Sequence, residues 1–213
     1  MKKLTVLFLL VFNVLVVKSQ TNSISHFQFG IKLGSGMQTV TGCPLNHIPR
    51  LAFMGGFWFQ LKMRKNWSLQ TEVGNIGKGT GLGVRQSTYG DYWLNLYYFE
   101  MPLLLQYHKK NTYVEFGPSV AVLINTGEYV YTGALLYQPD QYPFYKKDLS
   151  FQLGAAYAFH EKWRIGIRIN HALLPVRKQL PGTSHAFYTR GVMLVLSRQF
   201  NLHGDKKNQS KTD

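Results

Sequence analysis

The sequence predicts an all-β protein, an eight-stranded antiparallel up-and-down transmembrane β-barrel. Three observations carry this prediction. Apolar residues alternate with polar or small residues, with a period of two, through most of the chain. The alternating segments are as long as tilted membrane strands, which need about 9–11 residues, whereas soluble strands average about five or six. Short and long connections between these segments alternate along the chain.

The first predicted strand, 25–37, shows the alternation most clearly. One of its faces is large and apolar and the other is polar or small: Phe27, Phe29, Ile31 and Leu33 against His26, Gln28, Gly30, Lys32, Gly34 and Gly36. The same rule predicts seven further strands, over 51–63, 67–76, 93–107, 112–124, 148–159, 163–173 and 187–200. Because this count is even, both ends of the barrel are expected at the same rim.

The connections predict how the barrel sits in a membrane. The short turns are 64–66, 108–111 and 160–162. The long connections are rich in Gly, Pro, Asn, Tyr and Thr, and they cover 38–50, 77–92, 125–147 and 174–186. Short periplasmic turns and long extracellular loops are the asymmetry of bacterial outer-membrane barrels. Aromatic residues flank the short turns, as membrane-interface girdles require: Trp67, Tyr107 and Trp163.

The chain ends predict export. Residues 1–19 begin with Lys2 and Lys3, continue with an apolar run from Leu4 to Val17 and end in Ser19, which predicts a cleaved signal peptide. A membrane anchor is the alternative, but the run contains Asn13 and is too short to span comfortably. Residues 20–200 are then the outer-membrane barrel, and the polar tail 201–213 is expected to be disordered in the periplasm. The predicted location is the cell outer membrane.

Composition limits the partners and the chemistry. The net charge is +14, yet charged residues are only 16% of the chain, against about 25% in soluble domains. For an exported protein, this positive charge indicates outer-membrane lipid and lipopolysaccharide as partners, and no nucleic acid. The single Cys43 forms no intramolecular disulfide and no metal site by itself. No motif for a metal, a nucleotide or another cofactor is present, so no cofactor is expected.

Charged residues inside the alternating segments predict a structural site. In a membrane barrel the apolar face points to lipid and the polar face fills the lumen. This rule turns three carboxylates and four cations inward: Glu72, Glu100, Glu115, Lys32, Lys62, Arg164 and Arg168. Paired, these charges offset the cost of their desolvation. The sequence therefore predicts a luminal charge network, with glycines such as Gly30 making room for Trp58. Bulges or bends are expected near Pro102 and Pro118.

The hairpin "YFEMPLLLQYH…TYVEFGPSVAVLI" resembles the paired-strand signature of the PorT-family outer-membrane β-barrel proteins of Bacteroidetes. The matching residues are Glu100, Pro102, Glu115, Gly117 and Pro118. The segments "FGIKLGSGM", "LQTEVGNIGKG" and "GVMLVLSRQFNL" fit the same pattern. The resemblance covers the chain that follows the signal peptide, and it implies an outer-membrane barrel. Members similar to PorT itself belong to the type IX secretion machinery.

Several functions are compatible with such a barrel. The leading prediction is a non-enzymatic protein with a structural or interaction role and exposed extracellular loops. One alternative is a subunit of a secretion complex, which would bind a partner through loop 125–147 and its tyrosines: Tyr129, Tyr131, Tyr137, Tyr142 and Tyr145. A narrow pore is a further alternative. So is a lipid-modifying enzyme using His171, Ser184 and His185, although their spacing matches no catalytic motif. A soluble barrel of the lipocalin kind would instead bury its apolar face inside.

Overall fold

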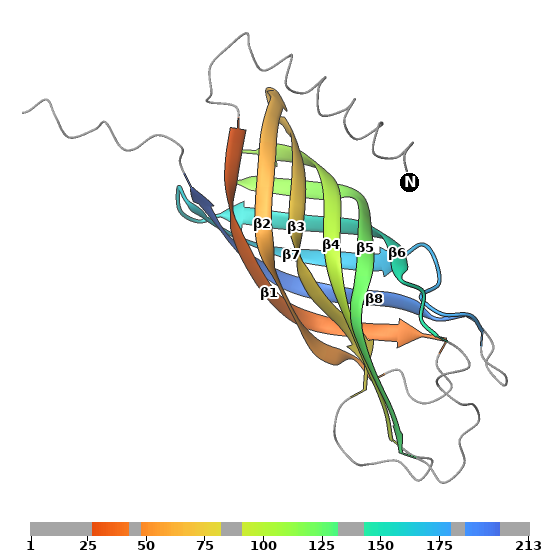
Figure 1. The fold of residues 1–213 in the computed structure, drawn as a ribbon. Helices are drawn as coiled ribbons and strands as arrows, with labels where there is room; N and C mark the ends of the chain where they lie inside the picture. The colour runs from red at the N-terminus through yellow and green to blue at the C-terminus, as the bar shows by residue number, and fades with distance from the viewer. Residues whose placement is uncertain (1–26, 43–47, 82–90, 132–142, 180–185, 201–213) are drawn as a thin grey trace, which may run out of the picture.

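Eight antiparallel strands pair in chain order and close into a barrel in the computed structural model (Figure 1). The structure describes residues 27–42, 48–81, 91–131, 143–179 and 186–200. The strands are β1 (Phe27–Thr41), β2 (Arg50–Arg64), β3 (Trp67–Thr80), β4 (Asp91–Lys109), β5 (Thr112–Tyr131), β6 (Lys147–Ala158), β7 (Trp163–Ala172) and β8 (Tyr188–Phe200). The predicted fold class and all eight predicted strands are confirmed.

Closure depends on β1, which pairs with β2 on one side and with β8 on the other. Its register with β2 runs from Phe27↔Leu61 to Gln38↔Arg50. Its register with β8 includes Leu33↔Leu196. Because the sheet returns to its first strand, the closed part of the barrel has no open edge, and its strands pair with a neighbour on both sides. Such pairing is what a sheet in hydrocarbon requires.

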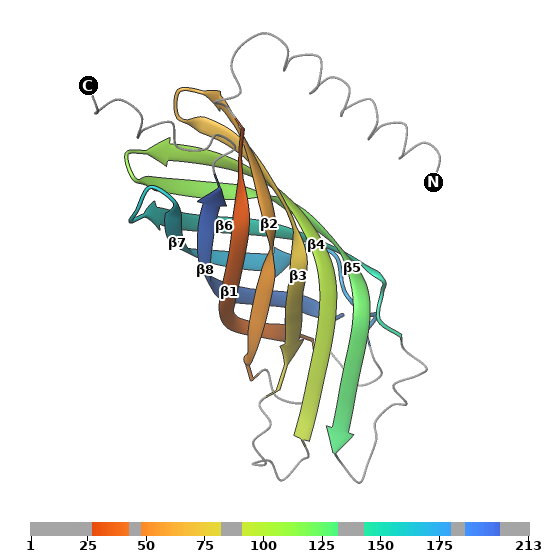
Figure 2. The ribbon, with the colours of Figure 1, turned by 60° about the vertical axis from the view of Figure 1, so that its left-hand side comes forward.

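The two ends of the barrel differ. The β2–β3, β4–β5 and β6–β7 turns lie together with the start of β1 and the end of β8, at the upper left of Figures 1 and 2; we call this the turn end. Lys65 and Lys110 make two of these turns possible by adopting positive φ angles of 42° and 55°. The opposite end carries the longer connections, and we call it the loop end. The predicted alternation of connections is confirmed.

At the loop end the strands run further than the sequence indicated. β3 continues to Thr80, β4 begins at Asp91 and β5 continues to Tyr131, so that β4 and β5 project beyond their neighbours (Figure 2). The segment after residue 76 was expected to be loop because of its glycines. Gly79 instead stays in the ladder with a φ of 151°, and a Cβ there would lie 2.0 Å from the Leu94 carbonyl oxygen. The glycine permits the close approach of β4 that keeps this segment in the sheet.

The sidedness of the strands is that of a membrane barrel. Large apolar side chains are exposed on the outer face, for example Leu33 (63%), Phe57 (59%) and Ile167 (57%). Charged and amide side chains such as Arg168 and Gln60 are buried on the inner face. Aromatic pairs lie on the outer face near the turn end, as in Trp67–Tyr107, whose ring centroids are 5.0 Å apart. This arrangement is the reverse of a soluble barrel and contradicts the lipocalin alternative.

The prolines of β4 and β5 do not shift the strand register. β4 and β5 keep the same register from Met101↔Val120 to Leu105↔Phe116, on both sides of the two prolines. The register shift of this pair lies instead between Tyr97 and Tyr98, nearer the loop end. The prediction of a bulge near Pro102 and Pro118 is therefore wrong, and the alternative of a strand bend stays a prediction. The β4–β5 register continues unchanged past both prolines, although the pairs between Pro102↔Ser119 and Leu105↔Phe116 are missing from the ladder.

The loop-end half of the lumen contains an apolar cluster. Buried apolar side chains from the strands meet Val176 and Phe187 from the β7–β8 connection there: Val40, Met54, Ile76, Leu94, Leu96, Tyr98, Met193 and Val195. Backbone hydrogen bonds hold this connection in place, from Val176 N to Phe187 O (2.8 Å) and from Tyr145 N to Val176 O (2.8 Å). The expectation of a lumen filled by polar groups is therefore only partly right for this half. Buried polar side chains such as Lys78 and Asp148 share it with the apolar cluster, on which the inward-folded connection packs.

The predicted signal peptide 1–19 and tail 201–213 lie outside the described residues, and so does Cys43. Both domain boundaries stay predictions. Among the described residues, no helix has the length and hydropathy that crossing a membrane requires.

Candidate functional site in the barrel lumen

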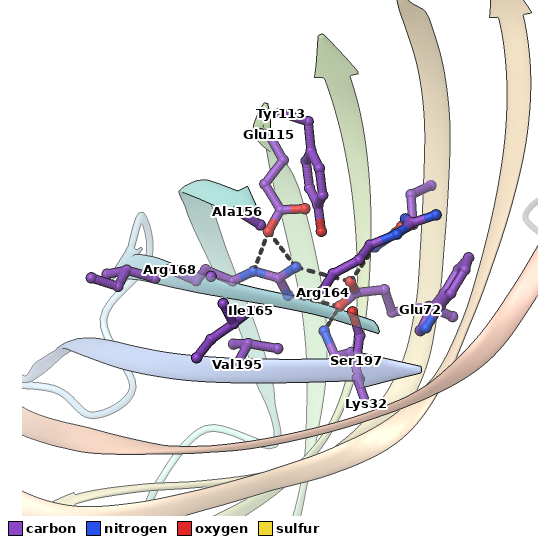
Figure 3. Close-up of a pocket in the computed structure, with 14 residues that line it drawn as sticks. Lys32, Glu72, Tyr113, Glu115, Ala156, Arg164, Ile165, Arg168, Val195 and Ser197 are labelled. Carbon is purple, nitrogen blue, oxygen red and sulfur yellow. Dashed lines mark hydrogen bonds and ion pairs between the residues drawn. The ribbon is translucent and has the colours of Figure 1, made fainter. Parts of the chain in front are cut away.

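The centre of the lumen holds a charge cluster drawn from four strands: Lys32 of β1, Glu72 of β3, Glu115 of β5 and Arg168 of β7 (Figure 3). Arg168 lies between the two carboxylates. Its Nη1 and Nη2 donate to Glu72 Oε2 and Oε1 at 2.8 and 2.9 Å, and its Nε donates to Glu115 Oε1 at 2.8 Å. Lys32 Nζ donates to Glu72 Oε2. None of the four residues is more than 5% exposed.

The positive and negative charges of the central cluster balance one another. Two cations face two carboxylates, so the four residues sum to zero. Gln70 Nε2 donates to Glu72 Oε1 at 2.6 Å, and Gln106 Nε2 donates to Glu115 Oε2 at 2.9 Å. Every carboxylate oxygen of the cluster therefore accepts at least one hydrogen bond. A buried ion pair is tolerated only when such additional bonds complete its hydrogen bonding.

Glycines let these side chains reach one another across the sheet. Gly154 of β6 is paired with Glu115 on one side and with Arg168 on the other. A Cβ at Gly154 would lie 2.9 Å from Glu115 Oε1, in the space that the ion pair uses. Gly30 does the same for Trp58, whose ring atoms would lie 2.7 Å from a Cβ there. The structure thus places Trp58 over Gly30, where the sequence predicted the room for it.

A second charge cluster lies toward the loop end and consists of Lys78, Glu100 and Asp148. Lys78 Nζ lies 2.8 Å from Asp148 Oδ2 and 3.3 Å from Glu100 Oε1, and the lysine is fully buried. The same ammonium group lies 5.1 Å from the centroid of the Tyr98 ring. Glu100 therefore has a partner that the sequence analysis did not name, and its carboxylate is not part of the central cluster.

Two of the predicted cations make no ion pair with described residues. Arg164 donates to three amide oxygens instead, those of Gln60 (3.0 Å), Gln28 (3.2 Å) and Gln199 (2.7 Å). Its guanidinium also lies 4.9 Å from the centroid of the Trp58 ring. Lys62 is exposed at the turn end. The β2–β3 register shifts between Lys62 and Arg64, just before the turn, and at this rim the lysine side chain reaches solvent.

Sequence reasoning missed Lys78 and Asp148. Lys78 continues the inward parity of Glu72, Gly74 and Ile76, but the predicted third strand ended at 76. Asp148 has the same parity as the inward Ser150 and Gln152 of β6, and that alternation was its only signal. Extending the alternation of inward and outward residues to the true ends of β3 and β6 would have identified both residues.

The arrangement leaves little free space. One cavity beside the central cluster, lined by Lys32, Trp58, Glu115, Arg164 and Arg168 among others, has a volume of about 20 Å³. A cavity of this size holds about one water molecule. Among the described residues, no group of three or more His, Cys, Asp or Glu side chains is arranged to hold a metal ion. Of the three residues considered for an enzyme, His171 is exposed on the outer face, and Ser184 and His185 lie outside the described residues.

Comparison with known proteins gives the family. The chain matches, over residues 18–177, the family model described as "Outer membrane protein beta-barrel domain". No curated protein matches the chain. Among solved structures, similar folds include Ail, the attachment invasion locus protein of Yersinia pestis, at 10% identity and a TM-score of 0.48, covering 82% of this chain and 99% of that one.

Two further similar folds are Neisserial surface protein A (8% identity, TM-score 0.48, 81% and 97% of the two chains) and OprG from Pseudomonas aeruginosa (11%, 0.41, 82% and 94%). The family match alone covers well over half of this chain. The closed barrel with its apolar outer face is the structure that such a match implies. The chain therefore belongs to the outer membrane protein β-barrel domain family, and it is a protein of the outer membrane.

Proposed function

We propose that this protein is a closed, non-enzymatic outer-membrane barrel with a structural or interaction role, which presents its loop end at the cell surface. The observation that carries the proposal is the filled lumen. The central charge cluster crosses the middle of the barrel, and the apolar side chains around Phe187 lie with the second charge cluster in the loop-end half. A barrel of eight strands encloses only enough space for such side chains. The cavity beside the central cluster has a volume of about 20 Å³, room for about one water molecule, which supports a closed lumen.

Orientation follows from the turns. Bacterial outer-membrane barrels keep short turns in the periplasm and long loops outside. The turn end would then face the periplasm, together with a tail over 201–213, after removal of a signal peptide over 1–19. Outer-leaflet lipid, including lipopolysaccharide, would surround the loop end.

Membership of a PorT-like branch is the finer proposal. It is supported by the hairpin residues that carry the resemblance, which have defined places in this barrel. Glu115 supplies one of the two carboxylates of the central charge cluster, and Glu100 supplies one of the two in the second charge cluster. Gly117 lies so close to β4 that a Cβ there would be 2.0 Å from the Leu103 carbonyl oxygen. A pattern with these residues at these positions would specify the packing of β4 against β5.

A protein partner at the loop end is a second candidate function, as in a secretion complex. β5 continues from its last β6 pair, Val122↔Lys147, to Tyr131, so the β4–β5 hairpin projects from the barrel (Figure 2). Tyr145 is 39% exposed beside it. Tyr137 and Tyr142 lie outside the described residues, as do the side chains of Tyr129 and Tyr131. Affinity purification from native membranes, with and without deletion of residues 132–142, tests this candidate.

Single-channel recording in planar bilayers tests the main proposal. The folded protein should give no sustained conductance, and its expression should leave the mass of lipid A unchanged. Steady channels would contradict the closed lumen, and a new lipid A mass would contradict the non-enzymatic role.

A further inference from the structure

The outer face of β7 and β8 carries a ladder of five directly opposed residue pairs. From the loop end to the turn end the pairs are His171↔Arg190, Ile169↔Val192, Ile167↔Leu194, Ile165↔Leu196 and Trp163↔Arg198. The three middle pairs are aliphatic and exposed, between 39% and 57%. An apolar strip therefore runs along these two strands, with an arginine at each end.

The two ends of this strip differ in how their arginine is satisfied. At the turn end, the Arg198 guanidinium lies 5.4 Å from the Trp163 ring centroid and 5.8 Å from that of Phe200. These aromatic rings stabilise its charge. At the loop end, Arg190 and His171 are both exposed, and neither has an ion pair or a hydrogen bond with a described side chain.

Among the carboxylates whose side chains the structure describes, none pairs with Arg190. Glu72, Glu100, Glu115 and Asp148 are buried in the lumen. Glu128 accepts from Arg177 Nη1 at 2.6 Å, and Glu161 lies in the β6–β7 turn at the opposite end. Two nitrogen-rich side chains directly opposite each other on one sheet face, without an anion between them, destabilise the pair when both are charged. The pair is suited to an anion supplied from outside the chain.

The position of the pair defines that anion. Eight residues separate Arg190 from Arg198, which at about 3.3 Å per residue and a tilt of about 40° corresponds to a height of roughly 20 Å. This approaches the apolar band of about 25 Å in membrane barrels. Arg190 and His171 thus lie at the level of the lipid headgroups, directly above a strip on which an acyl chain can pack.

We propose that Arg190 and His171 form a binding site for the phosphate group of an outer-leaflet glycolipid, whose acyl chains pack on the Ile169↔Val192 and Ile167↔Leu194 pairs. A guanidinium donates two parallel hydrogen bonds to a phosphate, and an imidazole N–H supplies a third. The inference deepens the proposed function, because it rests on the loop end lying in the outer leaflet. It names the lipid chemistry and the residues that this surface selects.

Native mass spectrometry of the folded, full mature chain tests this site. The protein in a zwitterionic detergent is offered equal amounts of bis-phosphorylated lipid A and of the same lipid after enzymatic dephosphorylation. The wild-type protein should retain the phosphorylated form preferentially, and Arg190→Gln with His171→Gln should reduce this preference by about fivefold or more. Arg198→Gln is the matched control, since it removes the same charge from the same face of β8, and it should keep the preference.

Folding of each variant is verified by heat-modifiable migration on gels, and Arg190→Lys, which keeps the charge, should retain most of the preference. Equal retention of the two lipids by the wild-type protein would overturn the site. So would an equal loss in Arg198→Gln, which would indicate general charge attraction, or displacement of the lipid by millimolar inorganic phosphate, which would indicate a site for the free anion. The conductance measurement is independent of lipid retention. Failure of this lipid site can therefore be distinguished from failure of the closed-barrel proposal.

Discussion

Arg168 of β7 and Glu115 of β5 meet across the intervening strand β6, with Nε and Oε1 2.8 Å apart. Gly154 is the β6 residue between them, paired in register with both. The contact therefore spans three strands, and the same guanidinium also binds Glu72 from the other side of the lumen. A barrel of eight strands is narrow enough for one side chain to join opposite walls in this way.

Gly154→Ala should destabilise the barrel by about 1–3 kcal/mol, because the added Cβ would overlap the carboxylate of Glu115. Equilibrium urea unfolding in lipid vesicles, followed by tryptophan fluorescence, measures this change. Gly55→Ala is the matched control, because Gly55 lies on the outer, lipid-facing side of β2. A Cβ there would lie 3.2 Å from Leu33 Cδ2, the flexible end of that side chain. Equal effects of the two substitutions would show that the space over Gly154 is not needed.

Lys78→Met should cost several kcal/mol of unfolding free energy, of the order of 3–5 kcal/mol, because Glu100 and Asp148 would remain buried without their cation. The same unfolding titration measures it. Lys62→Met removes an exposed lysine and should change stability by no more than about 0.5 kcal/mol. A Lys78 variant as stable as the Lys62 variant would remove the second charge cluster from the explanation of stability.

Ile167→Lys tests which face of the sheet meets lipid. Ile167 is 57% exposed at the middle of β7, so a lysine there should cost about 2–4 kcal/mol in a bilayer. Leu173→Lys, just beyond the loop end of β7 and similarly exposed at 52%, should cost about 0–1 kcal/mol. In water both positions would accept lysine. A tolerated lysine at Ile167 in vesicles would therefore contradict the transmembrane placement of this face.

Phe187→Ala should loosen the loop-end half of the lumen. Phe187 is fully buried and its backbone fixes Val176, so its removal should cost about 3–5 kcal/mol and expose amides of the β7–β8 connection to exchange. Hydrogen–deuterium exchange at 173–179 measures the second effect. Leu174→Ala, at an exposed position of the same connection, should leave exchange there unchanged. Unchanged protection in the Phe187 variant would mean that this side chain does not hold the connection down.

The fold could be predicted from the sequence because the alternation of apolar and polar residues within each strand identifies its two faces. Phe27 and Phe29 alternate with Gln28 and Gly30 regardless of which strand lies beside them. The short turns near Lys65 and Lys110 were readable for the same local reason. The ends of the strands were harder to predict. The Gly-rich segment that contains Lys78 has loop composition, and its pairing with β4, which the sequence does not show, keeps it in the sheet.

The pairing of the charged side chains within the lumen could not be predicted from the sequence. The alternation shows that Glu100 and Glu115 both point inward, but the height of each charge depends on the registers of strands far apart in sequence. Those registers separate Glu100, beside Lys78, from Glu115, beside Arg168. The apolar cluster at the loop end was missed because Val176 and Phe187 belong to a connection, and no periodicity marks a connection that folds inward.

The central claim is that buried ion pairs between distant strands fill the lumen and stabilise this barrel, and a double-mutant cycle on Glu115 and Arg168 tests it most directly. Unfolding free energies are measured in vesicles for the wild-type protein, Glu115→Gln, Arg168→Gln and the double variant. Each single substitution should be strongly destabilising, and the double variant should be more stable than their sum predicts, with a coupling of about 1–3 kcal/mol. Additive effects, with a coupling near zero, would contradict the claim.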